Sequence, residues 1–204
     1  MNRFEQAVHA CMEPTAELVA RTTDPRHRAI LLNWWRHVHL EGAGEFDAIV
    51  APDMMADHPV YRVTWGRTPA VIEGKDGVLA FYRSVGESVL WHSDDRLAVA
   101  DWGISNELTF HQLAAGKDLR AVGYDLPDTE ELFHVSSRQA FIWPYDYRAR
   151  LAGEHLYEDK TSLEIEAVVP ADAITPARVR EINQELLGRL EAERGPGFWK
   201  LGDD

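Results

Sequence analysis

The segment Leu151–Asp159, with the sequence LAGEHLYED, carries an acid, an imidazole and a phenol on one predicted strand. Because side chains alternate along a strand, Glu154 shares a face with Leu156, while His155 shares the other face with Tyr157. A carboxyl group buried in an apolar environment has a raised pKa and can transfer protons near neutral pH. If its face points into the protein, Glu154 is therefore a candidate general acid or base.

Glu154 also has a purely structural interpretation. Arg138 or Arg148, which precede it in the chain, could form an ion pair with its carboxylate. Such a pair would lower the pKa of the carboxyl group and support the fold without any chemistry. The sequence leaves both interpretations open.

A second set of candidates lies in the predicted extended segment Met54–Val63. His58 precedes Pro59 there, and an imidazole can move protons at neutral pH. Tyr61 could donate a hydrogen bond to an oxyanion that develops during a reaction. Both could instead be ordinary strand residues, with His58 bonded to a neighbouring carbonyl and Tyr61 engaged in packing. We predict catalytic roles for His58, Tyr61 and Glu154.

Three further residues are candidate ligand contacts. Asn106 interrupts a run of apolar residues that alternates with period two from Leu97 onward, and a buried amide needs partners that a ligand can supply. His111 lies on the opposite face of the same run, but a register slip of one residue would exchange the two faces. Trp35 belongs to a predicted helix, where tryptophans are first of all core residues. We predict that Trp35, Asn106 and His111 bind the ligand.

The elements that position these residues are mostly helices in the first part of the chain and strands in the second. Asp24 followed by Pro25 is typical of a helix start, and Gly42 and Gly44 end that helix. Long strands joined by short turns predict an antiparallel sheet and therefore an α+β fold. The predicted helices are Phe4–Arg21, Pro25–Leu40, Phe46–Val50, Lys75–Val85 and Thr175–Arg194; the predicted strands are Met54–Val63, a long strand from Leu97, Leu132–Trp143 and Arg150–Tyr157, with a loop over Ala114–Glu131.

Composition excludes several classes of function. A chain of 204 residues suits a single core domain, and its formal net charge of −13 disfavours nucleic-acid binding. Cys11 is the one cysteine, which excludes an intrachain disulfide, and no Cys/His cluster has the spacing of a zinc site. No segment has the apolar length of a signal peptide core or a membrane span. We expect a cytoplasmic protein without a metal.

Several features follow one another in a specific order along Arg26–Leu163. After the opening helix come Asp57-His58-Pro59, the turn Glu73–Gly77 ahead of Phe81-Tyr82, and the close Gly153–Asp159. This order and spacing resemble the ketosteroid isomerase and polyketide cyclase (SnoaL-like) group, within the superfamily named after nuclear transport factor 2 (NTF2).

The resemblance implies a cystatin-like cone, in which a curved antiparallel sheet wraps around N-terminal helices and encloses an internal pocket. The cone domain would span residues 25–165. Residues 1–24 would be an N-terminal helical extension, and residues 166–204 would be a C-terminal helical appendage.

The resemblance does not settle the activity, because this superfamily includes isomerases, cyclases, dehydratases, epoxide hydrolases and pure binding proteins. The position that carries a catalytic aspartate in limonene-epoxide hydrolases falls on Leu156, which disfavours that reaction. The tyrosine and protonated aspartic acid of the better-known isomerases have no residue-by-residue counterparts here. The resemblance thus implies a lyase, isomerase or cyclase that uses general acid–base chemistry without a cofactor.

The implied ligand is a small hydrophobic or polycyclic molecule. The alternative is a non-catalytic module of the same fold, which binds a small ligand or serves dimeric assembly, so whether the protein is an enzyme stays open. Proteins of this resemblance commonly pair through the open face of the sheet, and we therefore expect a homodimer. The predicted C-terminal helix offers further apolar surface at Ile182, Leu186, Leu187 and Leu190.

Overall fold

The computed structural model describes residues 1–66, 68–85, 88–121 and 123–202 of the chain. Among these residues, helices fill the first quarter of the chain, and the rest holds all the strands, which form one sheet, together with three further α-helices. The helices are α1 (Arg3–Ala10), α2 (Glu13–Arg21), α3 (Pro25–Ala43), α4 (Phe46–Ile49), α5 (Gly74–Val85), α6 (Gly116–Ala121) and α7 (Pro176–Arg194), and the strands are β1 (Met55–Val63), β2 (Ala70–Glu73), β3 (Val89–Ala100), β4 (Gly103–Ala115), β5 (Leu132–Pro144) and β6 (Leu151–Ala167).

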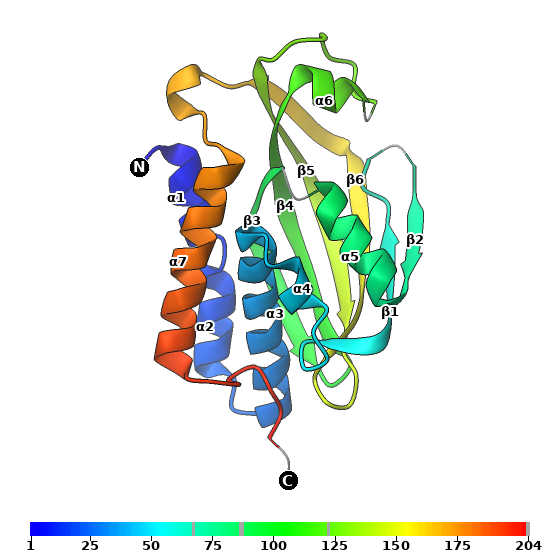
Figure 1. Ribbon diagram of the computed structural model, residues 1–204, viewed down its shortest axis with the longest axis vertical. Coiled ribbons are helices and arrows are strands. Elements are labelled where there is room, and N and C mark those ends of the chain that lie inside the picture. The colour runs from blue at the N-terminus through cyan, green and yellow to red at the C-terminus, as the bar shows by residue number, and fades with distance from the viewer. Residues whose placement is uncertain (67, 86–87, 122, 203–204) are drawn as a thin grey trace.

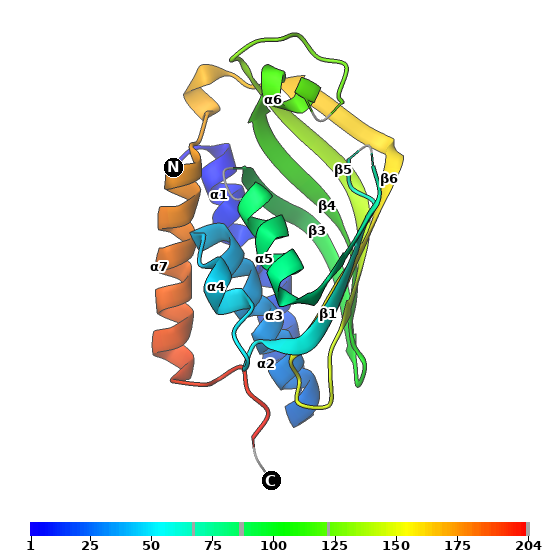
Figure 2. The ribbon, with the colours of Figure 1, turned by 45° about the vertical axis from the view of Figure 1, so that its right-hand side comes forward.

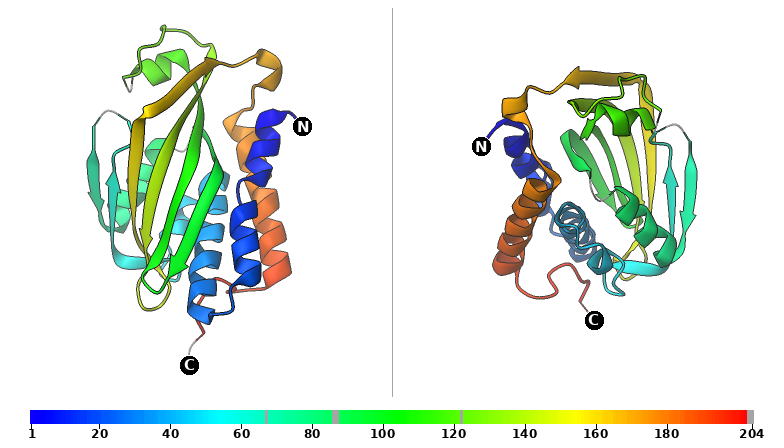
Figure 3. Two further views of the ribbon diagram at one scale, coloured as in Figure 1. Left: turned by 180° about the vertical axis from the view of Figure 1, so that it is seen from behind. Right: turned by 45° about the horizontal axis from the view of Figure 1, so that its top comes forward.

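The sheet is curved, and its strands lie in the order β2-β1-β6-β5-β4-β3. It bends around α3 and α5, while α1, α2 and α7 lie together beside α3 (Figures 1 and 2). The view from above shows how the sheet and these helices face one another across the interior (Figure 3, right). The predicted α+β cone is therefore confirmed.

The predicted antiparallel pairing holds from β3 to β6, but β6 also pairs with β1 in parallel. The sheet is therefore mixed rather than wholly antiparallel. Gly153 allows this contact, because a Cβ atom at this position would lie 2.1 Å from the carbonyl oxygen of Val60. The close approach brings the next residue of β6, Glu154, directly opposite Tyr61 of β1.

Helix α3 begins as predicted. The carboxylate of Asp24 accepts a hydrogen bond from the backbone N–H of His27, and Pro25 occupies the first turn, where its missing N–H costs nothing. The helix ends at Ala43 rather than near Leu40, because Gly44 provides the left-handed cap, with φ of 78°.

One predicted helix and one predicted strand are each divided into two elements in the structure. The single helix predicted over Phe4–Arg21 is broken between α1 and α2, since Pro14 lacks the N–H of a continuing helix and its ring would clash with the preceding turn. The single long strand predicted from Leu97 is the hairpin of β3 and β4, which turns at Asp101-Trp102. Apolar and polar residues continue to alternate through this turn, so the sequence pattern gave no sign of it.

Smaller differences lie elsewhere in the sheet. The predicted loop Ala114–Glu131 contains the end of β4 and the short helix α6, and β6 continues to Ala167 rather than ending at Tyr157. Strand β2 was not predicted. It is short and pairs only with β1, at the edge of the sheet.

Helix α7 packs against α3 and α1 (Figure 1). Ile182 and Leu190 of α7 are buried within the chain, and Leu186 and Leu187 are partly buried against the two core clusters. The apolar face of α7 therefore does not offer the free surface that was expected to support a dimer. No helix in the described parts of the chain is long and apolar enough to cross a membrane.

Candidate functional site

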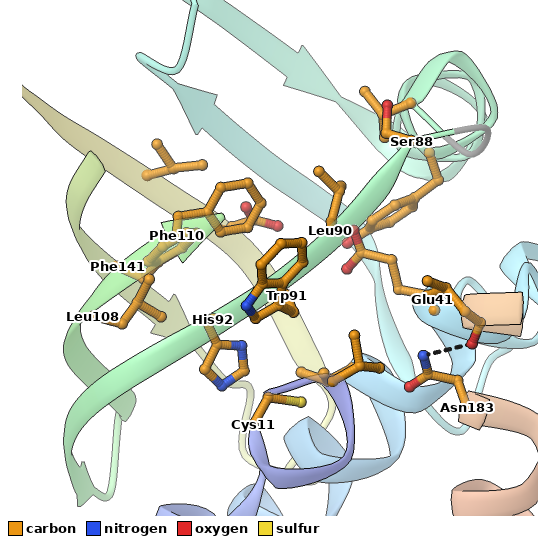
Figure 4. Close-up of a pocket in the computed structure, with 18 of the residues that line it drawn as sticks. Cys11, Glu41, Ser88, Leu90, Trp91, His92, Leu108, Phe110, Phe141 and Asn183 are labelled. Atoms are coloured by element: carbon orange, nitrogen blue, oxygen red, sulfur yellow. Dashed lines mark hydrogen bonds between the residues drawn. The ribbon is translucent and has the colours of Figure 1, made fainter. Parts of the chain in front are cut away.

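A cavity of about 120 Å³ lies inside the cone, between the helices and strands β3 to β6 (Figure 4). One water needs roughly 10–15 Å³ of such space, so the cavity has room for a small organic molecule. Most of its lining is apolar and aromatic, as is usual for a small-molecule pocket. The aromatic residues of the lining include Trp34, Trp65, Phe110, Phe141 and Trp143.

Glu154 contributes a carboxyl group to this apolar lining. The residue is only 6% exposed, because β6 lies in the middle of the sheet between β1 and β5. Burial raises the pKa of Glu154 well above its ordinary value, and the nearby carboxylate of Glu41 raises it further. A hydrogen bond with Tyr82 opposes this shift without cancelling it. Glu154 is therefore protonated at a pH where an exposed glutamate is charged.

Tyr82 of α5 is the centre of a buried hydrogen-bond cluster. Its hydroxyl lies 2.9 Å from the hydroxyl of Tyr61 and 3.0 Å from Nε2 of His37, and its interaction with Glu154 lowers the pKa of that carboxyl group. Burial raises the pKa values of both tyrosines well above their ordinary range, so both stay protonated at neutral pH. The cluster joins β1, β6, α3 and α5 at one end of the pocket.

The surroundings of His37 determine the direction of its hydrogen bond with Tyr82. Its Nδ1 is buried and has no hydrogen-bond partner in the described part of the chain. An orphaned N–H is rarer than an orphaned lone pair, so the ring proton belongs on Nε2, which faces Tyr82 and lies 3.7 Å from the Glu41 carboxylate. Tyr82 then accepts from His37, and its own proton can go to the hydroxyl of Tyr61 or to Glu154.

Of the predicted site residues, the structure brings Tyr61 and Glu154 together. The ion pairs considered for Glu154 are not among the contacts of the described residues. Arg138 bonds to Glu107, whose side chain is exposed, and Arg148 lies in the turn before β6, where its backbone N–H bonds to Asp146.

Of Tyr61 and Glu154, Glu154 alone lines the pocket, and the other four predicted residues also lie outside the lining. Asn106 is buried behind it, where it accepts a hydrogen bond from Trp143. His58 is exposed on β1. Trp35 is half-buried and donates to Nε2 of His39 at 3.0 Å. His111 lies on the other face of the sheet, stacked on Trp91.

Sequence reasoning missed His37 and Tyr82 as members of the site. Asn33, His37 and Glu41 lie at four-residue spacing on α3, which gives this mostly apolar helix a polar stripe. Such a stripe on a buried helix is a usable signal, because buried polar groups need partners. Tyr82 was noted as part of a motif, but nothing in its spacing indicated that its hydroxyl faces a strand.

Comparisons with known proteins give structural likenesses only: no protein-family model matches the chain, and no curated protein does. A candidate polyketide cyclase from Xanthomonas campestris pv. campestris is 11% identical, with a TM-score of 0.51, over 67% of this chain and 94% of its own. An NTF2-like protein from Anabaena variabilis is 13% identical, with a TM-score of 0.50, over 69% and 95%. Rv0760c from Mycobacterium tuberculosis is 18% identical, with a TM-score of 0.50, over 72% and 100%. These likenesses show that the chain has the NTF2-like cone fold.

Proposed function

We propose that this NTF2-like protein is an enzyme that transfers a proton within a small, largely apolar molecule, as a cofactor-independent isomerase, lyase or cyclase. The observation that carries the proposal is the buried carboxyl group of Glu154, which faces an aromatic pocket and is hydrogen-bonded to Tyr82. A carboxyl group is costly to bury without a cationic partner, and such groups concentrate at sites of proton transfer.

In this proposal, protonated Glu154 donates to a carbonyl or hydroxyl oxygen of the bound molecule as negative charge develops there. Tyr82 keeps its proton, because burial raises its pKa, and its interaction with Glu154 stabilises the carboxylate; this carboxylate takes its proton back when the oxygen of the product is released as a carbonyl group. The aromatic lining favours a flat or polycyclic body for the ligand. The name of the Xanthomonas protein supports the same class of reaction by analogy of fold.

The test begins with the ligand. Protein purified from its own host is examined by native mass spectrometry, and the molecule found is incubated with the protein in deuterated water. We expect the wild type to exchange or rearrange the molecule. Glu154→Gln keeps the shape of the side chain but cannot transfer the proton, and it should lower turnover ~100-fold or more.

Glu164→Gln is the matched control, because Glu164 is an exposed residue of the same strand, outside the pocket lining. Its turnover should equal that of the wild type. If Glu154→Gln retains full turnover, the catalytic role of Glu154 is wrong. If the molecule binds both proteins equally and neither changes it, the protein is a binding module.

A further inference from the structure

A second buried polar pair lies at the pocket, on strand β3. His92 lines the cavity and is 7% exposed (Figure 4), and Asp95, three residues later on the strand, is 9% exposed. Nε2 of His92 is 3.6 Å from Oδ2 of Asp95. Neither residue belongs to the Glu154 cluster, and neither was singled out by the sequence.

A β-bulge brings these two side chains together. His92 pairs with Phe110 of β4, but Asp94 and Asp95 together stand opposite the single residue Leu108. The extra residue is Asp94, which is exposed and has a φ of 52°, a left-handed conformation that is uncommon outside glycine. Without the bulge, Asp95 would point out of the cone. The strand thus adopts an unfavourable backbone conformation that places a carboxylate beside the histidine.

One oxygen of Asp95 is held by a chain of hydrogen bonds. Nε1–H of Trp143 donates to Oδ1 of Asn106 at 3.0 Å, and the amide of Asn106 donates to Oδ1 of Asp95 at 3.0 Å. Within the described ranges, Oδ2 of Asp95 and Nε2 of His92 are both buried and have no hydrogen-bond partner. A proton on Nε2 of His92 would point its positive end at the Asp95 carboxylate, although the 3.6 Å between the two atoms is longer than a hydrogen bond.

This arrangement leaves the other nitrogen of His92 as a lone pair. We propose that His92 is the proton acceptor of the pocket, through Nδ1, and that Asp95 is a positioning residue that holds the ring proton on Nε2. The inference rests on the proposed function, because it concerns a ligand in the same pocket. With a donor at Glu154 and an acceptor at His92, the ligand class becomes an enolisable carbonyl compound with an apolar body.

The groups around His92 are consistent with a neutral base. Burial lowers the pKa of His92 to about 4 and raises that of Asp95 to about 6. A hydrogen bond with the backbone of Cys11 opposes the shift in the pKa of His92, and His39 of α3 adds to it. The thiol of Cys11, which also lines the pocket, has a pKa raised to about 12 by burial, and it therefore stays neutral and does not compete as a base. The ring is thus unprotonated at neutral pH.

The first test reads the tautomer of His92 by nitrogen NMR on the ligand-free protein. We expect Nε2–H in the wild type. In Asp95→Asn, the amide of Asn106 still requires an oxygen acceptor, so the new NH₂ group should face His92 and move the ring proton to Nδ1. Asp94→Asn is the matched control and should keep Nε2–H, because Asp94 is exposed and asparagine tolerates its conformation. A wild-type ring protonated on Nδ1 overturns the proposal.

The second test measures proton abstraction with 5-nitrobenzisoxazole, a flat aromatic probe. His92 would take the proton from its carbon, the N–O bond would break, a nitrile would form, and the coloured phenolate would leave. His92→Gln and Asp95→Asn should each lower kcat/KM at least ~10-fold, while Asp94→Asn stays within about twofold of the wild type. Asp95→Asn is nearly isosteric, so its result stands even if His92→Gln folds poorly.

The outcomes separate this inference from the proposed function. Unchanged turnover of the probe in Asp95→Asn and His92→Gln overturns the role of His92 and leaves Glu154 untouched. Loss of turnover in these variants, with full turnover of the natural ligand in Glu154→Gln, supports His92 and removes the acid role of Glu154. The inference is also overturned if the wild type converts 5-nitrobenzisoxazole no faster than His92→Gln does.

Discussion

At the scale of single residues, the chemistry of the pocket depends on burial. Glu154, Tyr82 and His92 are common residue types whose pKa values are shifted because the cone removes them from water. An acid that stays protonated and a histidine that stays neutral are the two states that general acid–base catalysis needs at neutral pH. The same shifts have consequences for stability that can be measured without a substrate.

The raised pKa of Glu154 predicts a pH-dependent cost to stability. Above about 4.5, the unfolded chain releases a proton that the folded protein keeps, so the stability contributed by Glu154 is complete below this pH and is lost as the pH rises. Relative to Glu154→Gln, the wild type should lose up to ~1.4 kcal/mol of unfolding free energy per pH unit above 4.5. Urea denaturation of both proteins between pH 5 and 8 measures this. Parallel stability profiles would show that Glu154 has an ordinary pKa.

The sequence could predict Glu154 and Tyr61 because strand alternation fixes which side chains share a face. It could not predict the partners of Glu154. Tyr82 and His37 lie on helices, and their hydroxyl and imidazole groups meet the strands only through tertiary packing. His58 and Tyr61 show where prediction from the sequence fails. Both lie on β1, but only Tyr61 is buried in the cone, whereas His58 is exposed.

At the scale of elements, the bulge in β3 marks where sequence patterns stop being informative. Period-two reasoning assumes one residue opposite one, and a bulge breaks that count without any sequence signal here. The hairpin turn at Asp101-Trp102 is hidden for a similar reason, because alternation continues on both sides of it. The element types and most of their centres were predicted, whereas the residues at these irregularities were not.

The contact between α3 and α7 gives a prediction about one wall of the pocket. A Cβ atom at Gly42 would lie 2.3 Å from the amide of Asn183, which is buried and bonded to His39. Gly42→Ala should therefore lower the unfolding free energy by ~1–3 kcal/mol, despite the better helix propensity of alanine. Thermal and urea denaturation measure the change.

Gly188→Ala is the matched control for this substitution. Gly188 lies within α7, and no other atom is within 4 Å of the position of its added Cβ. The exchange should raise the unfolding free energy by roughly 0.5–1 kcal/mol. Equal effects of the two substitutions would show that α7 does not pack closely on α3.

At the scale of the whole molecule, we still predict a homodimer, now through the outer face of the sheet and not through α7. Tyr157 is 48% exposed on that face, opposite in direction to Glu154 and Leu156. Light scattering at micromolar concentration should give twice the chain mass of 23.1 kDa, and Tyr157→Arg should shift the protein to the monomer. Tyr147→Arg, in the exposed turn before β6, should leave the dimer intact. A monomeric wild type contradicts the prediction.

The central place of β6 in the sheet has a consequence for folding during synthesis on the ribosome. Strands β1 and β2 join the other strands only through β6, which is synthesised last among the strands. Until β6 emerges, the nascent chain holds two separate fragments of sheet and an unfinished core. Glu154 belongs to this last strand, and its carboxyl group must be dehydrated when β6 pairs with its neighbours. The closing step should therefore slow as the pH rises, because an ionised carboxylate is harder to dehydrate than a protonated one.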